Sequence, residues 1–421
     1  QGRFEFGLVG RDRELQQLDD AWIDVLADRS TRWVDLCGDA GVGKSRLLEE
    51  FLARRPGTVV LRGSCPSYGD GVTYFPIVQM VRQVAGAAAG TDRDTTVDLL
   101  ADVVPDVEVG AVLSSLLGLD DRVVPVAEVS WAVRQLVGHL AALRPVVVVI
   151  DSFNRAEPTL VELLQELVSF GGTTPALLVT MSRPARSLPD AVTVDVAPLS
   201  DDDCAALVLS AVGAALSAEQ VKLVVDAAAG LPLFIEQFLA TLVDEGRLQL
   251  QGEQWVLSTP FESLDVPPTV ESIVATRLDS LASVERSVAE AGSVIGRAFL
   301  AEVVTELLGE SDLSAALGGL VERDLVERSG VPSALSDHEF RNQMIRDVAY
   351  GGLLKRTRSE LHRRTAEWLV HHHAEPSLVE VEEVVGFHFE QSYLLGAEVG
   401  LEHGVLAATA DRAAVHLAEV G

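Results

Sequence analysis

The sequence is poor in cysteine and in aromatic residues. Its 421 residues include three cysteines, Cys37, Cys65 and Cys204. Such an odd and sparse set argues against a disulfide framework and is typical of a reduced, cytoplasmic protein. Aromatic residues make up only 5% of the chain against a hydrophobic content of 48%, so we expect cores built mostly from leucine, valine and alanine.

Basic residues are outnumbered, and long apolar runs are missing. The chain has 33 lysines and arginines against 63 acidic residues, a formal net charge of −30. Binding to DNA or RNA needs a basic surface, so we expect no direct nucleic-acid binding by this segment. No apolar run approaches the roughly 18 residues of a membrane span, and no signal peptide is recognisable, which favours a cytoplasmic location away from membranes. The first residue is Gln1 and not methionine, which leaves open that the segment belongs to a longer chain.

The strongest motif spans residues 38–45. It matches the P-loop pattern G-x-x-x-x-G-K-[ST], and it lies between an apolar strand at residues 33–37 and an amphipathic helix. Glycines allow the close backbone approach that phosphates need, and the helix N-terminus adds partial positive charge. Lys44 would reach the β- and γ-phosphates, and the Ser45 hydroxyl would bind Mg²⁺. The motif predicts a site for ATP or ADP formed by Gly38, Asp39, Ala40, Gly41, Val42, Gly43, Lys44, Ser45 and Arg46.

Two further strands supply polar residues to the same site. Residues 145–151 form a β-branched run, typical of a strand buried on both faces of a parallel sheet, and the run ends in Asp151. An acid at this place in a P-loop protein holds Mg²⁺, while the alternative is a helix cap. The strand at residues 175–181 leads to Arg183, which we expect beside the phosphates, with an exposed surface arginine as the alternative. We therefore predict Lys44, Asp151 and Arg183 as catalytic side chains.

The patterns divide the chain into four regions. Residues 1–199 predict an α/β P-loop domain with a parallel five-stranded sheet and helices on both faces. Residues 200–266 predict an all-α lid with a small hairpin, and residues 267–355 have the helix and hairpin pattern of a winged-helix domain. Residues 356–421 are helical, and we expect the start of TPR-like repeats there. The five strands are expected at residues 33–37, 58–62, 145–151, 175–181 and 192–196.

Together these stretches resemble the STAND class of P-loop ATPases, within the AAA+ and NB-ARC-like branch. This class includes LuxR-type transcriptional regulators of the MalT kind and ATPase modules attached to adenylate cyclases and Ser/Thr kinases. The resemblance covers residues 8–420. At its start, Val9, Gly10 and Arg11 are similar to the class's N-terminal motif, which contacts the adenine and the nearby nucleotide.

Further motifs carry the resemblance into the C-terminal half. Arg183 is similar to the sensor arginine of the class, and Pro232 to the proline that packs on the adenine. Residues 340–350 resemble the winged-helix signature, although Asn342 stands where many members have a histidine that senses the ADP phosphate. The resemblance implies a closed resting state that holds ADP, which ATP opens, often with homo-oligomerisation. An unknown inducer or protein partner would bind the C-terminal helical region.

One departure from the class concerns hydrolysis. The class usually has Asp-Asp or Asp-Glu at the end of the acidic strand, where the second acid activates water, whereas this chain has Asp151 followed by Ser152. A serine hydroxyl keeps its proton at neutral pH and is no general base, and Glu157 is the remaining candidate acid. We predict a nucleotide-dependent signalling switch with slow or absent hydrolysis, controlling an output such as transcription, a cyclase or a kinase. An active AAA+-like remodeller and a scaffold with a structural nucleotide stay open as alternatives.

Overall fold

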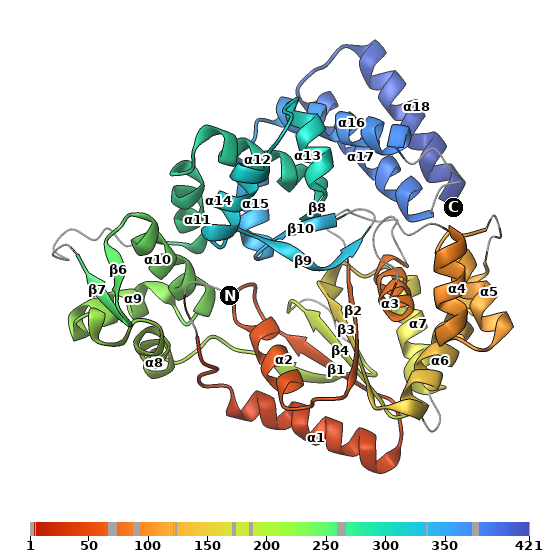
Figure 1. Cartoon of the computed structure of the whole chain (residues 1–421), viewed down its shortest axis with the longest axis horizontal. Coiled ribbons are helices and arrows are strands. Elements are labelled where there is room, and N and C mark those ends of the chain that lie inside the picture. The colour runs from red at the N-terminus through yellow and green to blue at the C-terminus, as the bar shows by residue number, and fades with distance from the viewer. Residues whose placement is uncertain are drawn as a thin grey trace.

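The structure is a computed structural model. It describes residues 4, 6–65, 74–86, 93–120, 122, 124–170, 174–184, 188–258, 267–333, 336–372 and 379–420. Figure 1 shows an α/β core with a mostly helical C-terminal half that lies over it. None of the described helices is long and apolar enough to cross a membrane.

The core is built on a five-stranded parallel sheet, as predicted. The strand order is β2-β3-β4-β1-β5. The strands are β1 (Arg32–Cys37), β2 (Val59–Ser64), β3 (Val146–Asp151), β4 (Ala176–Ser182) and β5 (Val192–Asp195), each within two residues of its predicted bounds. The strand that enters the P-loop and the strand that ends in Asp151 therefore flank β4, and their carboxyl ends lie at the same edge of the sheet.

Helices cover both faces of this sheet, which confirms the predicted layers. Val147 and Val149 of β3 pack with α1 (Asp12–Asp28) and α2 (Lys44–Ala53). The alternate residues of β3 face the opposite core, because successive side chains of a strand point to opposite faces. That second core is formed with α3 (Phe75–Ala85), α4 (Arg93–Val103), α5 (Val107–Leu116), α6 (Val126–Leu143) and α7 (Pro158–Ser169).

The next part of the chain consists of three helices and a hairpin, as expected for residues 200–266. The elements are α8 (Asp201–Val212), α9 (Ala218–Ala228), α10 (Pro232–Asp244), β6 (Leu248–Gln251) and β7 (Gln254–Leu257). The side chains of Ser200 and Ser217 accept hydrogen bonds at the first turns of α8 and α9. The predicted boundary at residue 266 lies outside the described residues.

Helices and a second, antiparallel sheet follow. They are α11 (Val270–Asp279), α12 (Ser283–Ile295), β8 (Ala298–Phe299), α13 (Ala301–Leu308), α14 (Ser314–Glu322), β9 (Val326–Ser333) and β10 (Ser336–Phe340), with the strand order β8-β10-β9. We call residues 283–340 the β8–β10 unit. The hairpin β9–β10 was predicted, whereas the two-residue strand β8 was not, because so short a strand has no detectable period.

The described residues after β10 form four helices. They are α15 (Gln343–Gly352), α16 (Lys355–His372), α17 (Val379–Glu398) and α18 (His403–Val420). A single cluster of buried apolar side chains runs from Leu199 to Ala413 and joins these helices to the preceding elements. This confirms a mostly helical C-terminal region, and its division at residues 266 and 355 stays a prediction.

Candidate nucleotide-binding site

The P-loop joins β1 to α2 at the carboxyl end of the sheet. Gly41 and Gly43 have φ angles of 79° and 102°, a region that glycine enters without the strain a Cβ brings. Lys44 is the first residue of α2, so its amide and the helix dipole face the same space as the loop. Its ammonium folds back and donates to the carbonyl oxygens of Gly38 at 2.6 Å and Asp39 at 2.9 Å.

The charge of Lys44 depends on its surroundings. Burial lowers the pKa of the Lys44 ammonium, the nearby carboxylate of Asp151 opposes this, and Arg183 adds to it. The three predicted catalytic side chains therefore interact electrostatically. A phosphate group between them would favour the charged form of the lysine, because opposite charges stabilise each other.

The loop also contacts α10. The backbone amide of Leu233 donates to the carbonyl oxygen of Gly41 at 3.2 Å. A Cβ at Gly41 would lie 2.8 Å from the Leu233 Cβ, a distance at which one of the two must move. Pro232 is the first residue of α10 and lines the same space as the loop. The first turn of α10 therefore packs directly on the phosphate-binding loop.

Arg11 positions the loop from the other side. It is 4% exposed and donates to the carbonyl oxygen of Val42 at 2.9 Å and to Glu14 Oε1 at 2.9 Å. Its guanidinium is therefore committed to protein partners within the loop and α1. The preceding Gly10 has a φ angle of 64°, and a Cβ there would lie 2.5 Å from the Asp203 carboxylate, so this turn packs against α8.

A buried polar network joins β1 to β4 beneath the loop. The hydroxyls of Thr180 and Ser182 donate to the two carboxylate oxygens of Asp35 at 2.7 Å and 2.6 Å. The Trp33 indole donates to the Thr180 hydroxyl at 3.0 Å. Burial raises the pKa of Asp35, and these hydrogen bonds oppose the rise. The network holds the end of β4, and hence the start of the segment that carries Arg183, at the level of the P-loop.

Asp151 and Ser45 supply oxygen atoms suited to Mg²⁺. Both line one cavity, and oxygen donors are what Mg²⁺ prefers. Asp151 Oδ1 accepts from the Ser152 amide at 2.6 Å, and Asp151 Oδ2 accepts from Arg297 Nη1 at 3.0 Å. The described residues contain no cluster of three or more histidine, cysteine, aspartate or glutamate side chains that could hold a metal alone. A Mg²⁺ here would therefore take further ligands from phosphates and water, as it usually does.

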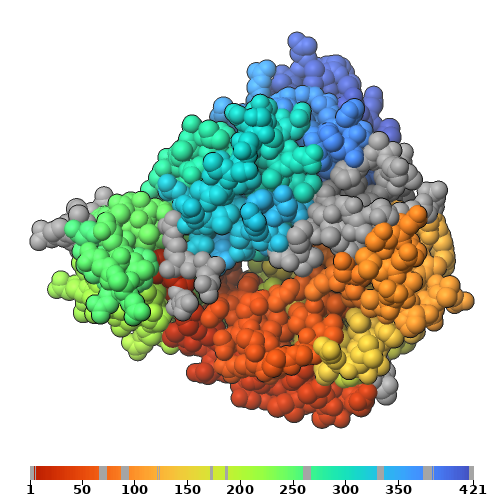
Figure 2. Space-filling model, in the orientation of Figure 1, coloured from red at the N-terminus to blue at the C-terminus, as the bar shows by residue number. Residues whose placement is uncertain are grey.

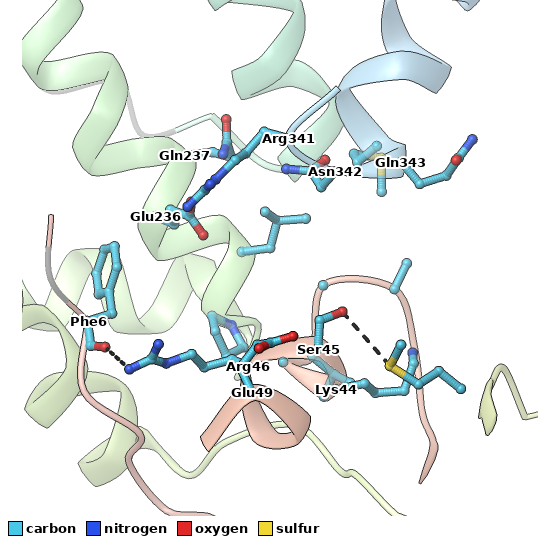
Figure 3. A pocket seen from close by; sticks show the side chains of 18 of the residues that line it. Phe6, Lys44, Ser45, Arg46, Glu49, Glu236, Gln237, Arg341, Asn342 and Gln343 are labelled. Carbon is cyan, nitrogen blue, oxygen red and sulfur yellow. Dashed lines mark hydrogen bonds between the residues drawn. The ribbon is translucent and has the colours of Figure 1, made fainter. Parts of the chain in front are cut away.

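The cavity has walls from both halves of the chain. Its volume is about 560 Å³, within the range of small-molecule sites. Figure 2 shows the surface hollowed between the core and the β8–β10 unit, and Figure 3 shows side chains of both walls facing each other. The lining includes eight basic side chains, which outnumber five acidic ones although the whole chain is strongly acidic, so the cavity suits an anion. They are Arg11, Lys44, Arg46, Arg155, Arg183, Arg277, Arg297 and Arg341, against Glu49, Asp151, Glu236, Asp324 and Glu327.

The wall opposite the P-loop is formed by α10 and the start of α15. Burial raises the pKa of Glu236, and the positive charge of Arg341 opposes this. Arg341 points toward Glu236 in Figure 3 and is also paired with Glu327. Asn342 caps α15 by accepting a hydrogen bond of 3.0 Å from the amide of Ile345, which leaves its amide nitrogen as the group able to donate into the cavity.

Most of the residues predicted from the sequence meet at this cavity. The lining includes Val9, Arg11, Ala40, Gly41, Val42, Gly43, Lys44, Ser45, Arg46, Asp151, Arg183, Pro232 and Asn342. Gly10, Gly38 and Asp39 do not line it. Glu236, Arg297 and Arg341 also line it and were missed, because no local pattern marks a lone charged residue that reaches a site through long-range packing.

The sheet, the P-loop and the acid at the end of β3 define a P-loop nucleotide-binding domain. Residues 7–179 match the AAA ATPase domain family, and the chain has the fold of a STAND-like P-loop ATPase. The match in fold is to a Pyrococcus horikoshii protein described as a Signal Transduction ATPase with Numerous Domains with a tetratricopeptide repeat sensor. It has a TM-score of 0.56 and 14% identity and covers 100% of this chain and 53% of that one.

The chain is also similar to one uncharacterised protein and to one further solved structure. An uncharacterised protein of Rhizobium meliloti (strain 1021) is 30% identical over 393 residues, which cover 86% of this chain and 37% of the relative. The ORC1 protein of Aeropyrum pernix, solved in complex with DNA, has 14% identity and a TM-score of 0.40, with 84% of this chain and 98% of that chain covered. That last score is too low to bear on function. This chain spans about a third of the Rhizobium protein and half of the Pyrococcus protein.

Proposed function

We propose that this chain is a signalling switch that binds ATP or ADP, with Mg²⁺, between its α/β core and its C-terminal half. One observation carries the proposal, namely that a single cavity has the P-loop on one wall and Glu236, Arg341 and Asn342 on the other. A ligand shifts a conformational equilibrium only through different affinities for the two states. A nucleotide that contacts both walls meets this condition. ATP and ADP differ in the γ-phosphate, which would add negative charge and contacts between the two walls.

The residues have distinct roles in this proposal. The backbone of residues 40–46 and the Lys44 ammonium bind the phosphates, and Ser45 and Asp151 hold Mg²⁺, which neutralises phosphate charge. Arg183 lies beside the phosphates at the carboxyl end of the sheet. Val9 and Pro232 provide the apolar wall for the adenine, and Asn342 donates to a phosphate oxygen.

The same site supports slow hydrolysis. Ser152 lines the cavity at the place of a catalytic acid, with a φ angle of 55°, and its hydroxyl is no general base at neutral pH. Glu157, the alternative acid, does not line the cavity. Bound ATP would therefore persist long enough to keep the chain in its ATP-bound conformation.

The wider role follows from the same fold. We propose that residues 200–266 form a helical lid, that residues 267–355, which include the β8–β10 unit, form a winged-helix domain over the site, and that α16, α17 and α18 begin a TPR-like region that binds an inducer or protein partner. The output would be transcription, a cyclase or a kinase, reached through nucleotide-dependent homo-oligomerisation in the cytoplasm and without nucleic-acid binding by this segment.

Mass analysis of the nucleotide retained by purified protein, before and after addition of ATP and Mg²⁺, tests the proposal. A switch retains ADP and exchanges it for ATP, and Lys44→Ala retains neither. Turnover above a few ATP per minute that Lys44→Ala abolishes would identify a remodeller instead. Retained nucleotide that never exchanges would identify a scaffold.

A further inference from the structure

One ion pair joins the two walls of the nucleotide site. Arg297 Nη1 donates to Asp151 Oδ2 at 3.0 Å, although the two residues are 146 positions apart. Arg297 lies between α12 and β8, and its carbonyl oxygen accepts from the amide of Phe340 in β10 at 2.8 Å. The backbone of Arg297 is therefore fixed to the β8–β10 unit, and its side chain connects this unit to the end of β3.

The guanidinium contacts the carboxylate that would hold Mg²⁺. One Asp151 oxygen already accepts from the Ser152 amide, and the other accepts from Arg297. Mg²⁺ binds carboxylate oxygens at about 2.0–2.1 Å and requires near-octahedral geometry. A guanidinium on the same oxygen would repel the metal and compete with it for that oxygen, so the ion pair and Mg²⁺ bound directly to Asp151 disfavour each other.

Arg297 has room and other partners when it leaves Asp151. It lines both the 560 Å³ cavity and a neighbouring cavity of about 430 Å³. One such partner is Glu339 of β10. Burial raises the pKa of the Glu339 carboxyl, and the positive charge of Arg297 is the largest of the charge effects that oppose this rise. The Arg297 Nε atom is buried without a hydrogen-bond partner in the part of the chain that the structure describes, so the group can still donate to an anion.

We propose that Arg297 is a specificity-determining residue that makes the closed arrangement favour nucleotide without Mg²⁺. By holding Asp151, it keeps the β8–β10 unit on the core; when Mg²⁺ takes Asp151, that contact is lost and the unit is released. The inference rests on the proposed nucleotide switch and assigns its metal dependence to one side chain of the β8–β10 unit.

The test compares ADP affinity in Mg²⁺ and in EDTA, measured by fluorescence with a labelled ADP. In the unchanged chain we expect ADP to bind at least as tightly in EDTA as in Mg²⁺. Arg297→Gln keeps a polar side chain but removes the charge. In this variant the Kd for ADP in Mg²⁺, divided by the Kd in EDTA, should fall about tenfold, the size of one charge-assisted contact. Arg297→Ala should do the same. Arg328→Ala removes an exposed arginine from β9 of the same unit and should leave the ratio unchanged.

A distance measurement supplies a second readout. Cysteines Cys37, Cys65 and Cys204 are buried, so spin labels can be placed at Ser169→Cys in α7 and Ala315→Cys in α14. We expect Mg²⁺ with nucleotide to lengthen this distance, and Arg297→Gln to lengthen it without Mg²⁺.

The outcomes separate the two proposals. A Mg²⁺ ratio and a label distance that are the same in Arg297→Gln and in the unchanged chain overturn the role of Arg297 while leaving the switch intact. An unchanged chain that binds no ADP in either condition overturns the proposed function, and this inference with it.

Discussion

Arg11 Nη2 donates a hydrogen bond of 2.9 Å to the carbonyl oxygen of Val42, and so ties the start of α1 to the P-loop. The same guanidinium pairs with Glu14, and both side chains are largely buried. Arg11→Met should lower the free energy of unfolding by about 3–5 kcal/mol, because it leaves the Glu14 carboxylate buried without its partner. Urea unfolding measures this.

A double-variant cycle is the control for Arg11. Arg11→Met with Glu14→Gln should cost less than Arg11→Met alone, since the stranded charge is gone. Both proteins should still bind ADP more weakly, because the loop carbonyl has lost its support. If the losses of unfolding free energy in the two single variants simply add in the double variant, and ADP affinity is unchanged, the pair does not position the loop.

Gly41→Ala should destabilise the protein more than Gly57→Ala. Both positions have positive φ angles, 79° and 93°, so both substitutions bring backbone strain of about 1–2 kcal/mol. Only at Gly41 does the new Cβ meet another residue, Leu233, at 2.8 Å, and overpacking adds about 1–3 kcal/mol. Calorimetric unfolding of the two variants gives the difference, which should be near zero if α10 does not pack on the loop.

Ser152→Asp should raise ATP hydrolysis. An acid at this position can accept a proton from water, and general-base catalysis typically contributes about 10²–10⁴-fold. Aspartate also tolerates the left-handed φ of 55° at this position better than most residues. We expect at least about tenfold faster phosphate release under saturating Mg²⁺ and ATP.

Ser152→Asn is the matched variant for this test, because it has the same shape and no basic oxygen. It should hydrolyse ATP as slowly as the unchanged chain. Equal rates in the aspartate and asparagine variants would show that the missing acid does not limit hydrolysis.

The buried pair His362 and His388 should make the protein less stable in acid. Their Nδ1 atoms are 2.8 Å apart, and the Tyr350 hydroxyl lies 3.0 Å from His362 Nε2. Burial lowers the pKa of His388 to about 3 and that of His362 well below its usual value. The unfolded chain therefore binds protons below about pH 6.5 that the folded chain does not, and stability falls as the pH drops.

The size of this effect can be measured against a variant. Each histidine should cost about 1.4 kcal/mol at pH 5.5 relative to pH 7.5. His388→Gln should lower the free energy of unfolding at both pH values. The difference in this free energy between pH 5.5 and pH 7.5, measured by urea unfolding, should be smaller than in the unchanged chain. A slope as steep as that of the unchanged chain would assign the pH dependence to other groups.

Local sequence was sufficient for the elements that depend on neighbours along the chain. The β-branched run of β3 and the glycines of the P-loop determine their local conformations, because side-chain shape and φ preference act within a few residues. The five strands, and the burial of β3 on both faces, were predictable for this reason. The short strand β8 was not, since two residues carry no period.

What the sequence determined by itself is therefore a P-loop on a parallel sheet, with Asp151 and Ser152 at the end of β3. Only the tertiary structure decided that Glu236, Arg297 and Arg341 reach the same cavity. Their side chains come from elements packed over the sheet edge, and such packing depends on the complementarity of whole surfaces. It also decided that Arg11 supports the loop through Val42, and that the oxygen expected to bind Mg²⁺ is held by an arginine from the opposite wall.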